Sequence, residues 1–203
     1  ALVLPSTKLR TGKALAFCVG TIVTANSILT LLIAWCAPAG TLPLLHLSST
    51  LSFALRLDGL GMLFSVLVSV LWVPTTFYAL EYMKHEGREK AFFSWFILTY
   101  GVVLGIAFSA NLLTLYFFYE LMTLTTLPLV MHAMDDRARA AGRKYLIYSV
   151  GGAACAFIAL VFTIGHGAGA SFVMGGNLDT TAAAVPRNTL LTVYLLGFLG
   201  FGV

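Results

Sequence analysis

One acidic residue, Glu120, lies within an otherwise apolar stretch, Asn111 to Val130 (NLLTLYFFYELMTLTTLPLV). About 20 residues of helix span about 30 Å, the thickness of the hydrocarbon part of a bilayer, and Glu120 falls near the middle of that length. A charged side chain at that depth costs about 2.5 to 3.5 kcal/mol to insert, so a retained acid usually faces a bundle interior or a watery path. Glu120 is therefore the leading candidate for proton or ion translocation. The alternative is a protonated carboxyl group that a nearby carbonyl or hydroxyl group satisfies.

Other polar side chains near Glu120 along the chain are candidates to relay a proton or to hold water. Tyr116 precedes Glu120 by one helical turn, and Thr123 follows it by nearly one turn. Lys144 is a second translocation candidate, because it can extend along the helix face that it shares with Tyr148, and Tyr148 is a further candidate to relay a proton or to hold water. Each has a simpler interpretation: a threonine hydroxyl often bonds to its own helix backbone, and a lysine at a span end extends to the interface.

The sequence predicts no catalytic residue, no metal site and no cofactor in this chain. The three cysteines do not form a CxxC pair, and the four histidines fall in connectors or at span ends. The glycine-rich GHGAGASFVMGG matches neither phosphate-binding pattern, so we interpret it as a loop. The cysteines are Cys18, Cys36 and Cys155, and the histidines are His46, His85, His132 and His166.

Composition predicts an all-α, polytopic transmembrane helix bundle. Hydrophobic residues make up 59% of the chain and charged residues only 10%, whereas a soluble domain has about 25% charged residues. We predict a single transmembrane domain over residues 1–203, with a turn-rich connector at 36–56 that has room for a short hairpin. The predicted spans are 14–35, 57–80, 91–109, 111–131, 145–165 and 189–203, and the last, which starts near Asn188, is truncated.

The basic residues predict the orientation of these spans. One set of alternate connectors carries Lys8, Arg10, Lys13, Lys84, Arg88, Lys90, Arg137, Arg139, Arg143 and Lys144, and the other carries Arg56 and Arg187. Short cytoplasmic connectors are enriched in Lys and Arg, so the first set is predicted to face the cytoplasm of a multi-pass protein in the cell (inner) membrane. The net charge of +4 is thus a topology signal, and we predict no nucleic-acid partner.

Four stretches together resemble successive helices of the antiporter-like subunits of respiratory complex I, Mrp-type cation/proton antiporters and membrane-bound hydrogenases. They are LRLDGLGMLFSVLVSV, YALEYM, NLLTLYFFYELMTLTTLPLVMH and AGRKYLIYSVGGAACAF. The resemblance implies the N-terminal part of a fold with two inverted five-helix repeats and a further helix before residue 1. It matches Glu120 to a buried glutamate that pairs with a lysine on a later, broken helix. The chain stops at LLGFLGFGV, before that lysine.

The resemblance implies a proton- or cation-translocating subunit of a multi-subunit energy-converting complex, in which Glu120 belongs to a charged relay. Its implied partners are other membrane subunits, the lipid bilayer and protons or Na⁺. Any redox chemistry of the complex would belong to other subunits. Two alternatives stay open: a structural membrane module of such a complex without transport of its own, and an independent secondary transporter.

Overall fold

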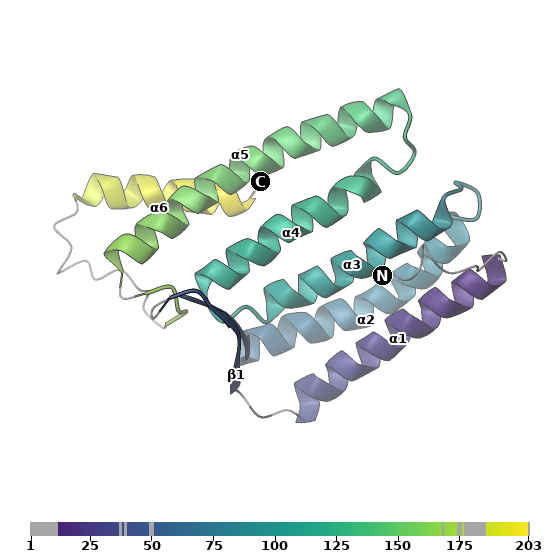
Figure 1. Cartoon of the computed structure of the whole chain (residues 1–203), viewed down its shortest axis with the longest axis horizontal. Coiled ribbons are helices and arrows are strands. Elements are labelled where there is room, and N and C mark those ends of the chain that lie inside the picture. The colour runs from purple at the N-terminus through teal and green to yellow at the C-terminus, as the bar shows by residue number, and fades with distance from the viewer. Residues whose placement is uncertain are drawn as a thin grey trace.

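The structure, a computed structural model, describes residues 12–36, 38, 40–48, 51–167, 169–173, 176 and 186–202. The described part contains helices and one two-stranded antiparallel sheet (Figure 1). The elements are α1 (Gly12–Cys36), β1 (Gly40–His46), β2 (Ser52–Leu57), α2 (Gly59–Tyr82), α3 (Glu89–Ala107), α4 (Leu112–Val130), α5 (Asp136–His166) and α6 (Arg187–Gly202). Five of the helices, α1 to α5, are long and apolar enough to cross a membrane, which confirms the predicted membrane-spanning bundle.

Short polar side chains define where three of the helices begin. Asp58, Asn111 and Asp135 each stand in extended backbone directly before a helix. Each side chain accepts a hydrogen bond from a backbone N–H group in the first turn, and so satisfies a donor that has no partner within the helix. These caps fix the positions at which the chain leaves its connectors.

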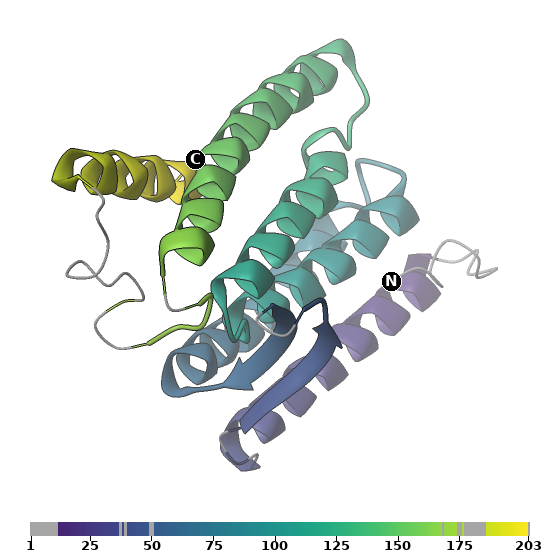
Figure 2. The same ribbon diagram turned by 60° about the vertical axis from the view of Figure 1, so that its left-hand side comes forward.

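The helices form a curved row in which each helix packs against the next one in the chain (Figures 1 and 2). Successive helices run in opposite directions, so their connectors alternate between the two ends of the bundle (Figure 1). The β1–β2 hairpin lies at the end where α4 begins and α3 ends (Figure 2), and β2 contacts α2 and α4. We refer to this end as the hairpin end.

Two features add detail to the sequence prediction. The connector at 36–56 contains the short hairpin for which it has room, and Thr41 pairs with Arg56 in it. The helix that contains the predicted span 145–165 is longer than the span and begins at Asp136. The segment Asp136–Lys144 is rich in alanine and arginine, which favour helix, and Asp135 caps it, so the helix extends beyond its apolar part.

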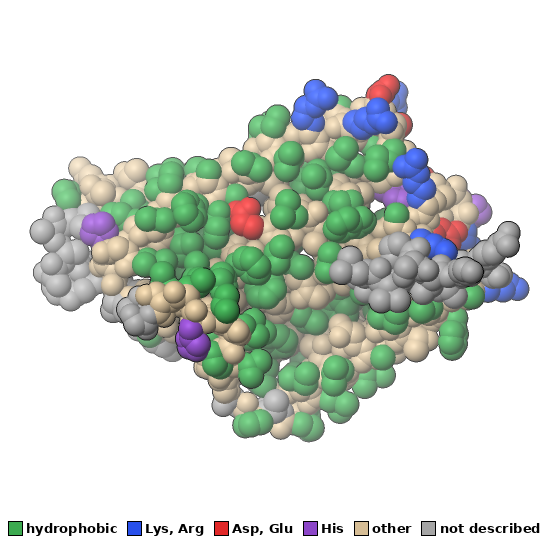
Figure 3. Space-filling model, viewed as in Figure 1, with side chains coloured by type: hydrophobic (Ala, Val, Ile, Leu, Met, Phe, Trp, Pro, Cys, Tyr) green, Lys and Arg blue, Asp and Glu red, His purple; other side chains and the backbone are tan. Residues whose placement is uncertain are grey.

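The buried core of the bundle joins α1, α2 and α3. Phe93 and Tyr100 of α3 have no exposed surface, and Val19 of α1 packs in the same cluster. Most of the remaining large apolar side chains face outward, as expected where the surroundings are lipid. Figure 3 shows apolar side chains spread over the visible face of the molecule.

The charged residues separate along the bundle. In Figure 3 the Lys and Arg side chains gather at the end opposite the hairpin, where the connectors after α2 and after α4 lie. The described basic residues of those connectors and adjacent helix ends are Lys13, Lys84, Arg88, Lys90, Arg137, Arg139, Arg143 and Lys144. Lys8 and Arg10 lie outside the described residues.

Candidate functional site

Glu120 lies in α4, eight residues or about 12 Å after the first residue of the helix. The side chain is half-buried, and among the described residues no charged side chain is buried as a whole. The Glu120 carboxyl group is nevertheless asymmetric, because its Oε1 atom is enclosed and has no hydrogen-bond partner. An enclosed acceptor without a partner is costly, and it leaves the group with unused capacity to accept a hydrogen bond or a proton.

Two tyrosines of α4 connect the neighbourhood of Glu120 to the next two helices. The Tyr116 hydroxyl donates to the carbonyl oxygen of Ala153 in α5 at 3.4 Å, and the Tyr119 hydroxyl donates to the carbonyl oxygen of Gly200 in α6 at 3.1 Å. Both tyrosines also interact electrostatically with Glu120. Sequence reasoning identified Tyr116 but missed Tyr119, whose position directly before Glu120 was the available signal.

Hydroxyl groups continue along α4 beyond Glu120. Thr123 is buried, with 7% of its surface exposed, in agreement with a place inside the bundle. The Thr126 hydroxyl donates to the carbonyl oxygen of Met122 and lies 2.6 Å from the hydroxyl oxygen of Tyr145 in α5. The Thr126–Tyr145 contact is therefore a side-chain link between α4 and α5 on the side of Glu120 toward the basic connectors.

The structure does not join Lys144 and Tyr148 to Glu120. Both side chains are exposed on α5, and Tyr148 is 68% exposed. The ion pairs among the described residues do not include Glu120 or Lys144. Tyr145, the neighbour of Lys144, contacts α4 through the hydroxyl group of Thr126.

A second polar cluster lies in the part of the bundle formed by α1, α2 and α3. We define it as the hydroxyl cluster of Ser27, Ser69 and Tyr100. The Tyr100 hydroxyl donates to Ser69 Oγ at 2.9 Å and makes a further hydrogen bond of 2.9 Å with Ser27 Oγ. All three side chains are buried, and the ring of Trp72 stacks on Tyr100. The cluster is neutral and joins three helices.

The DGLG sequence at the start of α2 places a charged pair at the hairpin end. Asp58 Oδ1 accepts a hydrogen bond from Gly61 N–H at 2.8 Å, and Arg56 Nη2 donates to Asp58 Oδ2 at 2.9 Å. The Gly61 N–H group, together with the Arg56 guanidinium, holds the pKa of Asp58 below its usual value, against the opposing effect of partial burial. Asp58 is therefore ionised at neutral pH.

Comparison with known proteins identifies relatives of both the sequence and the fold. Residues 45–93 match the family described as NADH-ubiquinone oxidoreductase (complex I), chain 5 N-terminus. The probable A/B subunit of a K(+)/H(+) antiporter from Rhizobium meliloti (strain 1021) is 33% identical over 112 residues, which are 55% of this chain and 11% of that protein. The A1 subunit of the Na(+)/H(+) antiporter from Staphylococcus aureus (strain JH9) is 33% identical over 103 residues, which are 50% of this chain and 13% of that protein.

The fold is also that of one protein in a solved membrane complex. A chain in the structure of the membrane-bound sulfane sulfur reductase, an archaeal respiratory membrane complex, superimposes with a TM-score of 0.71 and 13% sequence identity. The match covers 98% of this chain and 40% of that chain, so this chain spans only part of its relatives. The apolar spans, the matched family model over residues 45–93 and these relatives agree: about half of the chain is similar to antiporter-like membrane subunits of complex I and of Mrp-type antiporters.

Proposed function

We propose that this chain is part of a proton- or cation-translocating membrane subunit, and that Glu120 is the group that binds and releases the proton or ion. The observation that carries the proposal is the enclosed Oε1 atom of Glu120, which has no hydrogen-bond partner halfway along a membrane-spanning helix. Buried polar side-chain atoms in folded proteins normally have at least one hydrogen-bond partner, so this atom needs an explanation. An unfilled acceptor suits a group whose partner changes during function.

The chemistry needed from Glu120 is a reversible change of charge. An ionised carboxylate is an acceptor only, whereas the protonated form is neutral and has an O–H donor. A cation that approaches Glu120 favours the ionised form, and removal of that cation favours proton uptake. A coupled movement of charge elsewhere in a larger complex would therefore change the occupancy of Glu120. Lys144 is a candidate for such a cation if α5 or its surroundings rearrange.

Tyr116 and Tyr119 support this proposal by their position. Each interacts with Glu120 and also donates to a carbonyl oxygen of a neighbouring helix. A shift of α5 or α6 relative to α4 would change these hydrogen bonds, and so the surroundings of the carboxylate. Thr123 is buried less than one turn away and offers a hydroxyl group for water in the same region.

The relatives support a proposal for the partners, and the charge distribution supports one for the orientation. Relatives carry the names of antiporter subunits, and one solved relative belongs to a respiratory complex, so we infer that this chain assembles with other membrane subunits in the lipid bilayer. Any redox step would belong to those subunits. We also infer that the basic end of the bundle faces the cytoplasm, because positive residues are concentrated there.

The alternative with specific support is a structural module without transport. The hydrogen bonds from Tyr116 to α5 and from Tyr119 to α6 make α4 a packing centre, and Glu120 would then be a permanently protonated member of it. An independent secondary transporter has no comparable observation in its favour. The two leading functions differ in what the Glu120→Gln change does.

Transport by the complete natural complex in sealed vesicles tests the proposal. Glu120→Gln keeps the size of the side chain but cannot exchange a proton, so we expect translocation to be lost while the complex still assembles. Glu120→Asp keeps the acid on a shorter side chain and should retain part of the rate. A pH-sensitive dye reports proton movement, and blue native electrophoresis reports assembly. Normal transport by an assembled Glu120→Gln complex would assign Glu120 a structural role.

Orientation is tested by thiol labelling in intact cells. Single cysteines replace Gly87 or Ala140 in a variant without other cysteines, because both positions are exposed at the basic end. We expect a membrane-impermeant maleimide to label neither position until the cells are opened. Rapid labelling of both positions from outside would show that the basic end faces away from the cytoplasm.

A further inference from the structure

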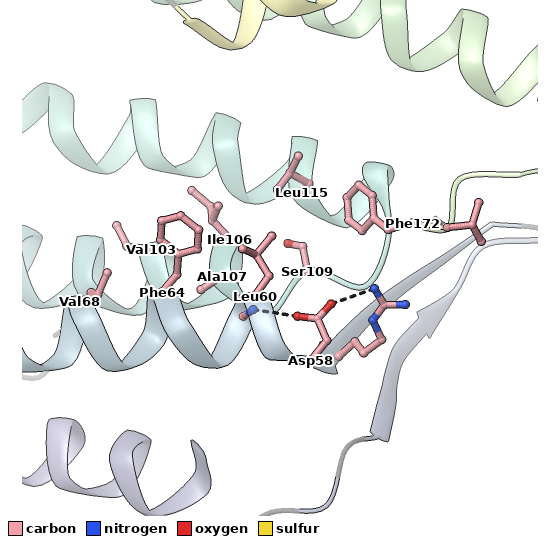
Figure 4. Close-up of a pocket in the computed structure, with 13 residues that line it drawn as sticks. Asp58, Leu60, Phe64, Val68, Val103, Ile106, Ala107, Ser109, Leu115 and Phe172 are labelled. Atoms are coloured by element: carbon pink, nitrogen blue, oxygen red, sulfur yellow. Dashed lines mark hydrogen bonds and ion pairs between the residues drawn. The ribbon is translucent and has the colours of Figure 1, made fainter. Parts of the chain in front are cut away.

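A cavity of about 620 Å³ lies at the hairpin end between α2 and α3, and is separate from the region around Glu120. Its volume is within the range of ligand sites in proteins. Figure 4 shows the ion-paired Asp58 at one end of the cavity and Phe64, Val68 and Val103 farther along the two helices. The cavity is thus polar at one end and apolar along its length.

The apolar part of the cavity has the length of one membrane leaflet. From Asp58 to Val68 the helix rises about 15 Å, which is half the thickness of the hydrocarbon layer. Its walls come mainly from α2 and α3, with further contributions from α4 and from the segment after α5. The apolar wall residues are Leu60, Phe64, Val68, Val103, Ile106, Ala107, Leu115, Phe172 and Val173. Ser109, which also lines the cavity, already donates to the carbonyl oxygen of Gly105.

At the polar end of the cavity, the group that can still form hydrogen bonds is a donor, the guanidinium of Arg56. Both oxygens of Asp58 already accept hydrogen bonds, one from Gly61 and one from Arg56. The Arg56 side chain, in contrast, lines the cavity with 32% of its surface exposed, and its Nη2 atom is the donor to Asp58. A guanidinium group has five N–H donors and no acceptor, and its geometry suits phosphate oxygens. A molecule that binds at this end of the cavity is therefore expected to supply an acceptor to the exposed part of the guanidinium.

We propose that the cavity binds a membrane phospholipid, with one acyl chain along the walls of α2 and α3 and the phosphate group accepting hydrogen bonds from Arg56. The depth of the apolar part and the position of the charged pair at its end match the two parts of such a molecule. The proposal is independent of ion translocation by Glu120, because the site does not share a residue with that region.

A photoactivatable lipid tests the site in the complete natural complex. The probe is phosphatidylethanolamine with a diazirine near the end of one acyl chain, incorporated into vesicles of phosphatidylethanolamine and phosphatidylglycerol. After illumination, mass spectrometry measures the labelling of the peptide that contains Phe64 and Val68, relative to the lipid-facing part of α1 around Leu29 and Leu32. We expect the cavity peptide to be labelled more strongly than α1. Equal or weaker labelling in the wild-type complex would overturn the proposal and would indicate that another polypeptide segment fills the cavity.

Two variants separate the headgroup contact from the chain contact. Arg56→Gln removes the guanidinium, and we expect the labelling ratio to fall about tenfold, since a hydrogen bond to a charged group is worth about 1.5 to 3 kcal/mol. Arg187→Gln is the matched control, because it removes the same charge from an exposed position outside the cavity, and it should leave the ratio unchanged. Val103→Trp should lower the ratio by filling the apolar part. An unchanged ratio in Arg56→Gln would show that the phosphate is not held by Arg56 and would contradict the proposal.

A diazirine-labelled fatty alcohol distinguishes a phospholipid from any apolar chain. The alcohol has no phosphate, so we expect it to label the cavity no more than the α1 reference peptide. If the alcohol gives the same ratio of cavity labelling to α1 labelling as the phospholipid, the site does not recognise the headgroup and the proposal is overturned.

Discussion

The two polar regions inside this bundle are built in opposite ways. In the hydroxyl cluster of Ser27, Ser69 and Tyr100, every member is buried and every hydroxyl group is hydrogen-bonded to a side chain of another helix. Around Glu120 the acid is only half-buried, and its enclosed oxygen has no partner. The hydroxyl groups of Tyr116 and Tyr119 bond there to backbone carbonyls of neighbouring helices.

This difference separates a structural polar contact from one suited to a changing partner. Neutral groups that satisfy one another hold helices at fixed positions, because each would lose a hydrogen bond if the helices moved. An ionisable group with an unfilled acceptor gains a bond when a proton or water arrives. The two regions also differ in how their helices pack. Large side chains fill the space between α1, α2 and α3, whereas Gly200 lets α6 lie close to the α5 backbone.

The largest predicted effect on stability comes from the glycine contact. A Cβ atom at Gly200 would lie 2.5 Å from the backbone nitrogen of Ala156 and 2.7 Å from the carbonyl oxygen of Gly152, so Gly200→Val must separate α5 and α6. We expect a loss of about 2 to 3 kcal/mol, measured as a lower midpoint of thermal unfolding of the complex. Gly202→Val is the control, because a Cβ atom there meets nothing within 4 Å. Equal midpoints for the two variants would show that the close approach is not needed.

The next largest effect is predicted in the hydroxyl cluster. Tyr100→Phe leaves Ser27 and Ser69 each without one hydrogen-bond partner, and we expect a loss of about 1 kcal/mol in stability. Transport per assembled complex should stay at the wild-type rate, because Glu120 is not affected. The exposed Tyr194 provides the control variant Tyr194→Phe, which should change neither quantity. A loss of transport in stable Tyr100→Phe complexes would place the hydroxyl cluster in the translocation path.

The smallest stability effect is predicted for a tyrosine-to-phenylalanine substitution at Tyr119, directly before Glu120. Tyr119→Phe removes one hydrogen bond to a carbonyl oxygen in α6, which is worth about 0.6 kcal/mol between membrane helices. Transport should nevertheless fall, because Tyr119 also interacts with Glu120. The ratio of dye response to the amount of assembled complex measures this effect. A wild-type ratio for Tyr119→Phe would limit the functional region to Glu120 and Tyr116.

Much of the fold followed from apolar length and from caps. The positions of the spans were predictable because a bilayer imposes a minimum length, and because Asp58 and Asn111 mark two helix starts. The start of α5 at Asp136 was not predictable from hydropathy, because hydropathy detects the apolar part of a helix and not the polar turns before it. The hairpin register depended on backbone pairing, for which the connector sequence gave no strong pattern.

The candidate site was only partly predictable. Glu120 was identifiable because a single acid in an apolar span is rare and costly. The role of Tyr119 depends on which face of α4 meets α6. The polar and apolar residues of α4 are not separated onto different faces, so sequence periodicity did not reveal that role. Lys144 and Tyr148 share a helix face, but that face is exposed in the structure. Helical spacing predicts which residues lie together, but not which neighbour they face.

The most direct test of the central claim measures transport and thermal stability together for Glu120→Gln and Tyr100→Phe in the same vesicle preparation. If Glu120 carries the proton or ion and the hydroxyl cluster is structural, the first variant assembles and does not transport. The second variant then transports at the wild-type rate and unfolds at a lower temperature. Transport by Glu120→Gln at the wild-type rate would contradict the account, whatever the result for Tyr100→Phe.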